Sequence, residues 1–101
     1  MDHPNTIDKE VKTRLRGKIE YGRVVDEIWF LHRPKTSPKE YSKGVQRVRF
    51  DSDGRIEYRF CYYERDKGKK SWHWGQYATF FPVSLTKRLI ATMKKEHWVR
   101  T

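Results

Sequence analysis

The alternation of apolar and polar residues along the chain predicts a helix at each end and strands between them. Near the start, Ile7, Val11 and Leu15 recur every four residues, and Thr6 precedes them in the position of a helix cap. A spacing of four places these apolar residues on one face of a helix. The pattern therefore predicts a short helical or arm segment within residues 1–18.

A strand and a loop are expected next. Residues 24–32 are rich in large apolar side chains, which suits a strand that is partly buried on both faces. One face would carry Val25, Trp29 and Leu31, and the other Val24, Ile28 and Phe30. Residues 33–44 combine two prolines and two serines with four basic residues, so we expect a basic loop there.

After Gly44 the apolar positions alternate, which is the period of a half-buried strand. Val48 and Phe50 share one face of the first strand. The next strand presents on one face Ile56, Tyr58, Phe60 and Tyr62. A three-residue turn with Gly54 in the left-handed conformation pairs Phe50 with Ile56 and keeps the apolar face whole, whereas two- and four-residue turns mix the faces. The sequence therefore predicts the three-residue turn.

The same register sets charged residues against one another on the open face of the sheet. Arg49 would oppose Glu57, and Arg47 would oppose Arg59. Like charges directly opposite each other destabilise a strand pair unless an anion lies between them. Long arginine side chains can also spread into solvent at little cost, so the pair indicates an anionic ligand without requiring one.

A second hairpin is predicted around Gly68, which has lysines on both sides. If Tyr62 opposes Trp74, the returning strand continues the core face as far as Phe80. A bulge at Gly75 would instead turn the two tryptophans of this strand toward solvent. The sequence leaves both orientations of these tryptophans open.

The last element predicted is an amphipathic helix with Ser84 as its N-cap. Its apolar stripe consists of Leu85, Leu89, Ile90 and Met93. Beyond the stripe, His97 and Trp98 either continue it or contact a second subunit. The expected order is helix, four strands and helix, with the sheet and the C-terminal helix forming the core of residues 45–98. This is an α+β fold, an antiparallel twisted sheet of about four strands with the C-terminal amphipathic helix packed on one face.

Length and composition restrict the class of protein. A chain of 101 residues is one domain, and an aromatic content of 15% indicates that it folds despite a charged fraction of 36% and a mean hydropathy of −1.02. Cys61 is the single cysteine, which excludes an intramolecular disulfide and a cysteine-based zinc site. The four histidines lack metal-ligand spacing, so we expect neither a metal nor a cofactor.

The chain also lacks the usual signals for a membrane or for export. No segment approaches the roughly 20 apolar residues that span a membrane, and residues 1–10 contain no apolar signal region. We therefore expect an intracellular protein, in the cytoplasm, nucleoid or nucleus, with no membrane partner. Dimerisation would enlarge the core of so small a domain, so a homodimer is expected as well.

The net charge of +10 is unevenly distributed along the chain. Residues 1–34 hold 7 basic and 6 acidic residues, whereas residues 35–101 hold 16 basic and 7 acidic residues. A basic surface of this kind attracts anionic partners, and nucleic acid is the commonest of them. The excess charge therefore points to the predicted sheet and C-terminal helix as the binding region.

Arginines, lysines and aromatic rings together are the parts of a platform for single-stranded nucleic acid. Cations follow the phosphates, and each exposed aromatic ring that stacks on a base contributes about 1–3 kcal/mol. The candidate binding residues are Arg47, Arg49, Arg55, Arg59, Tyr63, Arg65, Lys67, Lys69, Lys70, Trp72, His73, Trp74 and Tyr77. Any single aromatic residue is more often part of a core. A small domain cannot hide all of these rings on one sheet face, which favours the binding role.

The segment from Arg47 to Met93 resembles the single-stranded-DNA-binding domain of the positive cofactor four family of transcriptional coactivators. The shared features are a short basic strand, a turn, a longer strand that ends in aromatic and acidic residues, a glycine turn, a glycine-bearing strand and a helix. The resemblance implies a curved antiparallel sheet, a helix that builds a homodimer, and melted DNA on the basic and aromatic face, in transcription or replication.

Specific residues match the binding strands and turns of that family. They are Arg47, Arg49, Arg59, Tyr63, Lys67 and Lys69, with Trp74 close to the glycine-bearing strand. The chain differs from the family in the helix and strand expected before Arg33. It also has Trp72, His73 and Trp74 where the family has a proline, a glycine and a basic residue.

Two other classes of protein fit the sequence less well. A small basic ribonuclease or toxin would need an acid, a base and an arginine, for which His32, Glu64, Arg65, His73 and His97 are available, but their spacing shows no catalytic pattern. A basic adaptor for an acidic protein surface is the other alternative. We therefore expect a non-catalytic protein that binds single-stranded DNA or RNA and no small-molecule substrate.

Overall fold

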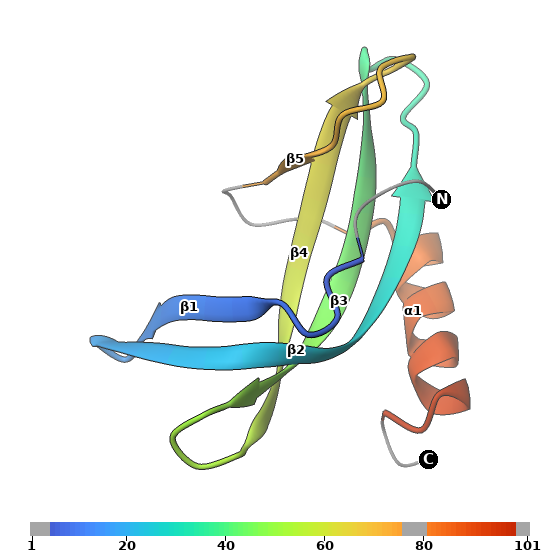
Figure 1. Ribbon diagram of the computed structural model, residues 1–101. Helices are drawn as coiled ribbons and strands as arrows, with labels where there is room; N and C mark the ends of the chain where they lie inside the picture. Colours follow the sequence, from blue (N-terminus) through green and yellow to red (C-terminus); the bar gives the residue numbers. More distant parts are fainter. Residues whose placement is uncertain (1–4, 76–80, 99–101) are drawn as a thin grey trace.

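The computed structural model describes residues 5–75 and 81–98 of the chain (Figure 1). In these ranges five strands form one antiparallel sheet, and each pairs with the next along the chain. The elements are β1 (Glu10–Leu15), β2 (Lys18–His32), β3 (Lys39–Phe50), β4 (Ile56–Asp66), β5 (His73–Trp74) and α1 (Val83–Lys95). The prediction of an antiparallel sheet with a C-terminal helix on one face is confirmed, with one strand more than expected.

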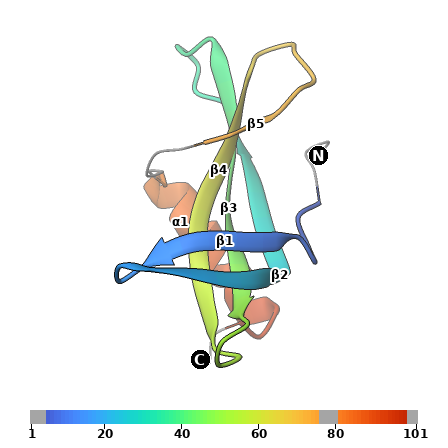
Figure 2. The ribbon, with the colours of Figure 1, turned by 60° about the vertical axis from the view of Figure 1, so that its left-hand side comes forward.

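The sheet curls into a half-barrel, and a bulge in β2 contributes to the curl. The register of β2 against β3 shifts between Val24 and Asp26. A bulge of this kind bends its strand and increases the local twist. The hairpin of β1 and β2 consequently crosses over β3 and β4, as Figure 2 shows. The sheet thus has a concave face toward β1 and an outer face toward α1 (Figure 1).

Two apolar clusters hold this arrangement together, one on each face of the sheet. On the outer face the buried residues are Ile28, Val45, Leu89, Met93 and Trp98, with Phe30 and Phe81 against them. On the concave face they are Val11, Val24, Val48 and Phe50, with Leu15 against them. The first cluster fixes α1 to the sheet, and the second fixes the β1–β2 hairpin over it.

The predicted N-terminal helix is wrong, because its residues form β1 and the turn into β2. Four is an even number, so Val11 and Leu15 share a face of a strand as well as a face of a helix. The turn decides between the two, because Arg16 and Gly17 have φ angles of 51° and 80°. Two successive positive φ angles are what a two-residue hairpin turn requires. Ile7, the third apolar residue of the spacing, is exposed.

The strand predicted at residues 24–32 is the second part of β2, but its faces are divided differently. Ile28 packs under α1, whereas Val24 lies in the concave cluster. The extra residue of the bulge reverses the alternation between them.

The basic loop is shorter than predicted, because residues 39–44 belong to β3: all of them pair with β4, and residues 41–44 pair with β2 as well. These residues are largely polar, which is why the sequence indicated a loop. The sheet can hold the one buried carboxylate among them, that of Glu40, because Arg33 and Arg65 pair with it.

The turn between β3 and β4 has four residues, 51–54, instead of the predicted three. The Phe50 N–H donates to the carbonyl oxygen of Arg55 at 3.0 Å, and Gly54 has the expected left-handed φ of 74°. The prediction assumed a single apolar face, but both faces of this sheet are covered. Phe50 therefore lies in the concave cluster, while Tyr58 on the next strand points to the outer face and donates to the Trp98 carbonyl oxygen.

The predicted opposition of Arg47 and Arg59 is wrong for the same reason. Arg47 pairs with Tyr58, and Arg59 pairs with Gln46. Successive side chains of a strand point to opposite faces. The two arginines therefore lie on opposite faces of the sheet, and the expected pairing of Arg49 with Glu57 is also absent, since Arg49 pairs with Ile56.

The register of β5 differs from the prediction by one residue. Tyr63, rather than Tyr62, opposes Trp74. The Gly75 N–H donates to the Tyr62 carbonyl oxygen at 2.8 Å, and a Cβ at Gly75 would stand 2.1 Å from the Tyr62 ring. The close approach of this ring to the glycine backbone sets the register. The rest of the predicted strand, residues 76–80, lies outside the described ranges.

Helix α1 begins at Val83 with Pro82 as its N-cap, so the prediction of Ser84 as the cap is wrong. The Pro82 carbonyl oxygen accepts hydrogen bonds from the Thr86 N–H at 2.9 Å and the Thr86 hydroxyl at 3.1 Å. The predicted stripe is correct except for Ile90, which is exposed. Within residues 5–75 and 81–98, no helix has the length and apolar character to cross a membrane.

The residues after α1 turn back onto the sheet. His97 has a φ of 61°, and the Trp98 N–H donates to the Met93 carbonyl oxygen at 2.8 Å, which is the bond that closes a Schellman motif. The Trp98 indole N–H donates to Asp26 at 3.1 Å. Trp98 is 6% exposed, so it extends the packing of α1 within this chain.

Candidate nucleic-acid interface

The concave face of the sheet forms a trough that contains two adjoining cavities. The first has a volume of about 270 Å³ and is lined chiefly by Val11, Leu15, Val48 and Phe50. The second has a volume of about 240 Å³ and includes in its lining Lys9, Lys12, Gln46, Tyr63 and Trp74. Arg59 lines both cavities. It therefore lies where the apolar part of the trough meets the basic and aromatic part.

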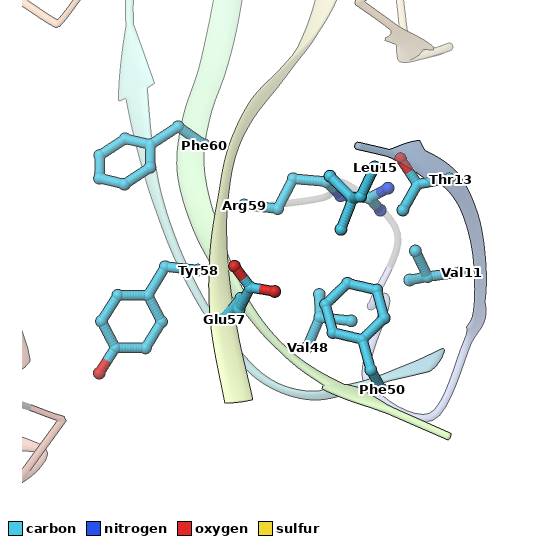
Figure 3. Close-up of a pocket in the computed structure, with 9 residues that line it drawn as sticks. All are labelled: Val11, Thr13, Leu15, Val48, Phe50, Glu57, Tyr58, Arg59 and Phe60. Atoms are coloured by element: carbon cyan, nitrogen blue, oxygen red, sulfur yellow. The ribbon is translucent and has the colours of Figure 1, made fainter. Parts of the chain in front are cut away.

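Figure 3 shows how three strands contribute to the apolar cavity. Side chains of β1 and β3 face each other across it, and Arg59 extends from β4 toward Leu15 and Thr13. Tyr58 and Phe60, which flank Arg59 in the chain, point away on the other side of β4. The alternation along β4 thus places Arg59 in the trough and its two aromatic neighbours outside.

Neutral groups hold Arg59 in place. Its Nε donates to Gln46 Oε1 at 2.8 Å, and its guanidinium carbon lies 5.0 Å from the ring centre of Trp74. Across the described part of the chain, no carboxylate forms an ion pair with Arg59. An arginine stays charged over the whole working range of pH. Its charge is therefore available to an anionic ligand.

A chain of hydrogen bonds fixes the amide that holds Arg59. Gln46 is 1% exposed, and its Nε2 donates to Thr6 Oγ1 at 2.9 Å. The Thr6 hydroxyl donates in turn to Glu27 Oε2 at 2.6 Å, and the Thr6 N–H donates to the same oxygen at 2.9 Å. Because the amide nitrogen of Gln46 already has its partner, the amide oxygen must face Arg59. The position of Arg59 is thus set by residues of three other segments.

The aromatic residues of the trough have different roles. Tyr63 is buried between Trp29 and Trp74, at ring-centre distances of 5.4 Å and 5.1 Å, and burial raises the pKa of its phenol. Trp72 is half-buried, and the guanidinium carbon of Arg65 lies 4.0 Å from its ring centre. Trp74 is 41% exposed. Among the three predicted aromatic residues described here, Trp74 presents the most exposed ring.

Arg65 belongs to a buried ion-pair network at one end of the trough. Its Nε lies 2.6 Å from Glu40 Oε1, and the Nε of Arg33 lies 2.6 Å from the other oxygen of the same carboxylate. The Glu40 side chain is 2% exposed. A buried carboxylate needs such partners, so we assign Arg65 a structural role.

Arg55 is also committed to carboxylates of its own chain. Its Nη2 lies 2.8 Å from Glu20, its Nη1 3.0 Å from Asp53 and its Nε 2.7 Å from Glu57. Hydrogen bonding by the Arg55 guanidinium lowers the pKa of Glu20, and its backbone N–H and guanidinium together lower the pKa of Asp53. The three carboxylates neutralise Arg55, although the sequence placed it among the binding residues.

Three predicted binding residues lie on the outer face instead of the trough. Arg47 stacks on Trp98, with 5.5 Å between its guanidinium carbon and the ring centre. Arg49, two residues further along β3, points to the same side and is exposed. His73 opposes Glu64, which shares the face of Tyr58 and Phe60. The predicted site is therefore divided between two faces.

The remaining candidates follow β4. Lys67, Lys69 and Lys70 are exposed in the connection to β5, where Lys67 Nζ donates to the Pro34 carbonyl oxygen at 2.6 Å. Tyr77 lies outside the described residues.

The residues of the rival enzyme hypothesis do not converge on one site. Glu64 and His73 are cross-strand partners, but Arg65 points to the other face of β4. His32 stacks on Tyr41 at 6.3 Å, and burial lowers its pKa. His97 ends α1. In the described ranges no group of three or more His, Cys, Asp or Glu residues could hold a metal ion.

Five polar residues that line the second cavity were not predicted from the sequence: Thr6, Lys9, Glu10, Lys12 and Gln46. The two lysines were assigned to a helix instead of β1 and the segment before it. Gln46 carried a recognisable signal, because it is an uncharged polar residue between the apolar Val45 and Val48 of a predicted strand. A buried amide in such a position needs polar partners.

Comparison of the chain with models of protein families, with curated proteins and with solved structures finds no match. The function is therefore inferred chiefly from the geometry of the trough.

Proposed function

We propose that the protein binds single-stranded nucleic acid in the concave trough and does so without catalysing a reaction. The observation that carries the proposal is the state of Arg59. This arginine is positioned by a buried amide, has no carboxylate partner among the described residues, and lies beside an exposed tryptophan. A cation beside an exposed aromatic ring can bind a phosphate while the ring stacks on an adjoining base.

Other charged residues support the same ligand. Lys9 and Lys12 line the cavity that Trp74 also lines, together with one acidic residue, Glu10, and Lys67, Lys69 and Lys70 are exposed at the far end of β4. No ion pair of Lys9 or Lys12 is found in the described part of the chain. Free lysines that bind phosphates release counterions from the nucleic acid, which makes the binding favourable and dependent on salt.

The form of the trough favours a single strand over a duplex. The Trp74 ring lines the second cavity of the trough and is exposed, so an isolated base can reach it. The bases of a duplex are stacked and paired, so their faces cannot contact a tryptophan without being unstacked. The resemblance of residues 47–93 to the positive cofactor four family points to the same class of ligand.

The proposal is tested by titrating the protein with a single-stranded oligonucleotide and with the duplex of the same sequence. We expect the single strand to bind more tightly, to quench the tryptophan fluorescence, and to lose affinity steeply as the salt concentration rises. Equal affinity for the two forms, or an affinity that is independent of salt, would contradict the proposal.

The matched variants are Arg59→Gln and Arg88→Gln. Each removes one positive charge, and the amide at position 59 can still donate to Gln46. Arg88 is exposed on α1, where it stacks on Phe30 at 4.8 Å on the face opposite the trough. Arg59→Gln should weaken binding of the single strand about tenfold, and Arg88→Gln should leave it nearly unchanged.

A further inference from the structure

We propose that the apolar cavity between β1 and β4 accepts one unstacked base of the bound strand, an inference that rests on the function proposed above. In this arrangement the phosphate next to that base binds Arg59, and the following base lies against Trp74. The trough would thus hold two consecutive nucleotides in two different environments.

The size of the cavity restricts its occupant. Its volume of about 270 Å³ lies just below the roughly 300–1,000 Å³ of pockets that hold drug-sized molecules. A single ring system therefore fits, whereas a larger ligand does not. Thr13 and Leu15 of β1 flank it on one side and Glu57 and Arg59 of β4 on the other (Figure 3). Val11, Val48 and Phe50 are each less than 5% exposed and form its buried apolar base, which suits the apolar face of a flat ring.

Two polar groups among the apolar walls indicate that the ring has a polar edge. The Thr13 hydroxyl and the Glu57 carboxylate both line the cavity. Arg55 Nε lies 2.7 Å from Glu57, but Arg55 shares its one positive charge with Glu20 and Asp53 as well, so this end of the cavity stays negative and suits a hydrogen-bond donor of a base rather than a phosphate. A purely apolar group would desolvate Glu57 and Thr13 without replacing their hydrogen bonds to water. The edge of a base can donate to the carboxylate and accept from the hydroxyl.

A positive charge, that of Arg59, lies at the boundary of the cavity. Arg59 lines the apolar cavity and the neighbouring one, and it has no carboxylate partner within the described ranges. The occupant of the apolar cavity therefore carries an anionic group beside its ring. A nucleotide within a strand has this combination of a ring, a polar edge and an adjoining phosphate.

The test uses two single-stranded octanucleotides, one with bases and one in which every residue is abasic. The variant Thr13→Trp fills the cavity with a ring from β1, at a strand position where aromatic residues are favoured. We expect Thr13→Trp to weaken binding of the octanucleotide with bases about tenfold and to leave binding of the abasic strand unchanged.

The control variant places a tryptophan on the other side of the β1–β2 hairpin, away from the cavity. Ile19→Trp replaces an exposed residue of β2 that pairs with Arg14, and it should change neither affinity. Unaltered binding of both strands by Thr13→Trp would overturn the base-pocket inference and leave the proposed function intact. An equal loss for both strands would also overturn it. Failure of the wild-type protein to bind either strand would refute the proposed function itself.

A measurement on the wild-type protein covers the case in which Thr13→Trp fails to fold. In the complex with the octanucleotide, nuclear Overhauser effects should connect base protons with the methyl groups of Val11, Leu15 and Val48. Their absence, together with effects between base protons and Trp74 alone, would show that bases bind in the trough without entering the apolar cavity.

Discussion

Arg55 and Arg59 lie four residues apart, face the same side of the sheet, and differ in almost every contact. Arg55 has carboxylates from Glu20, Asp53 and Glu57 within 3.0 Å, and its guanidinium carbon lies 4.4 Å from the ring centre of Phe50. Arg59 has one amide oxygen and a tryptophan ring. Carboxylates of the same chain neutralise the Arg55 guanidinium, whereas no carboxylate among the described residues neutralises the Arg59 guanidinium.

The difference shows that position on a face does not decide what an arginine does. Arg55 connects the β1–β2 hairpin, through Glu20, with the turn that precedes β4. Arg59 makes no such connection, and its Nε bond to Gln46 leaves the two Nη groups without a hydrogen-bond acceptor among the described residues. We therefore assign Arg55 to folding and Arg59 to binding.

The largest effect on folding is expected from Arg55→Met. This variant leaves three carboxylates without their cation, and it removes the connection between the hairpin and the turn. We expect the midpoint of thermal unfolding, followed by circular dichroism, to fall more in Arg55→Met than in Arg59→Gln. If the two variants unfold at the same temperature, the distinction between the arginines is wrong.

The next largest effect is expected on binding, from a variant that gives Arg59 a carboxylate partner such as Arg55 already has. Gln46→Glu places a carboxylate of nearly the same shape beside the Arg59 guanidinium. The new ion pair should neutralise Arg59 and weaken binding of a single-stranded oligonucleotide at least about tenfold at pH 7, as measured by fluorescence titration. Retained affinity would indicate that the free charge of Arg59 is not used in binding.

A smaller effect is expected on the stability of the folded protein at low pH. The pKa values of Glu20 and Asp53 are lower in the folded protein than their ordinary values of 4.5 and 3.8, chiefly because Arg55 bonds to the charged forms. Their contribution to stability is therefore present above those ordinary values, and it is lost as the pH falls through the lowered pKa values. Asp53 is exposed and Glu20 is only partly buried, so solvent weakens the effect.

The loss of stability in acid should therefore differ between a variant of Arg55 and a variant of Arg59. Urea unfolding at pH 7 and at pH 3 should show a smaller loss of stability on acidification in Arg55→Met than in the wild-type protein. Arg59→Gln should lose as much stability as the wild type. A wild-type acid response in Arg55→Met would mean that other carboxylates dominate the acid unfolding.

The sequence was sufficient to predict the β3–β4 and β4–β5 hairpins and the C-terminal helix, but neither the β1–β2 hairpin nor the strand register. The period of two identified β3 and β4, and Gly54 marked their turn. The choice of turn depended on the assumption that Val48 and Phe50 share a face with Tyr58. That assumption failed because apolar residues cover both faces of the sheet, and no local pattern says which strand face meets α1.

The candidate site was predicted in part. Residue type alone identified Arg59 and Trp74 as candidates, and also Arg55 and Arg65, which are paired with carboxylates. The distinction requires Glu20, which is 35 residues from Arg55, and Glu40, which is 25 residues from Arg65. The curl of the sheet brings these distant carboxylates to the arginines, so no short segment of the sequence shows which arginines are paired.

The central claim is that the charge of Arg59 contacts a phosphate, and the salt dependence of binding tests it most directly. For the wild-type protein, Arg59→Gln and Arg88→Gln, the logarithm of the association constant for one single-stranded oligonucleotide is measured against the logarithm of the salt concentration. The account predicts that Arg59→Gln reduces the slope by about one, and that Arg88→Gln retains the wild-type slope. A slope in Arg59→Gln equal to that of the wild type would contradict it.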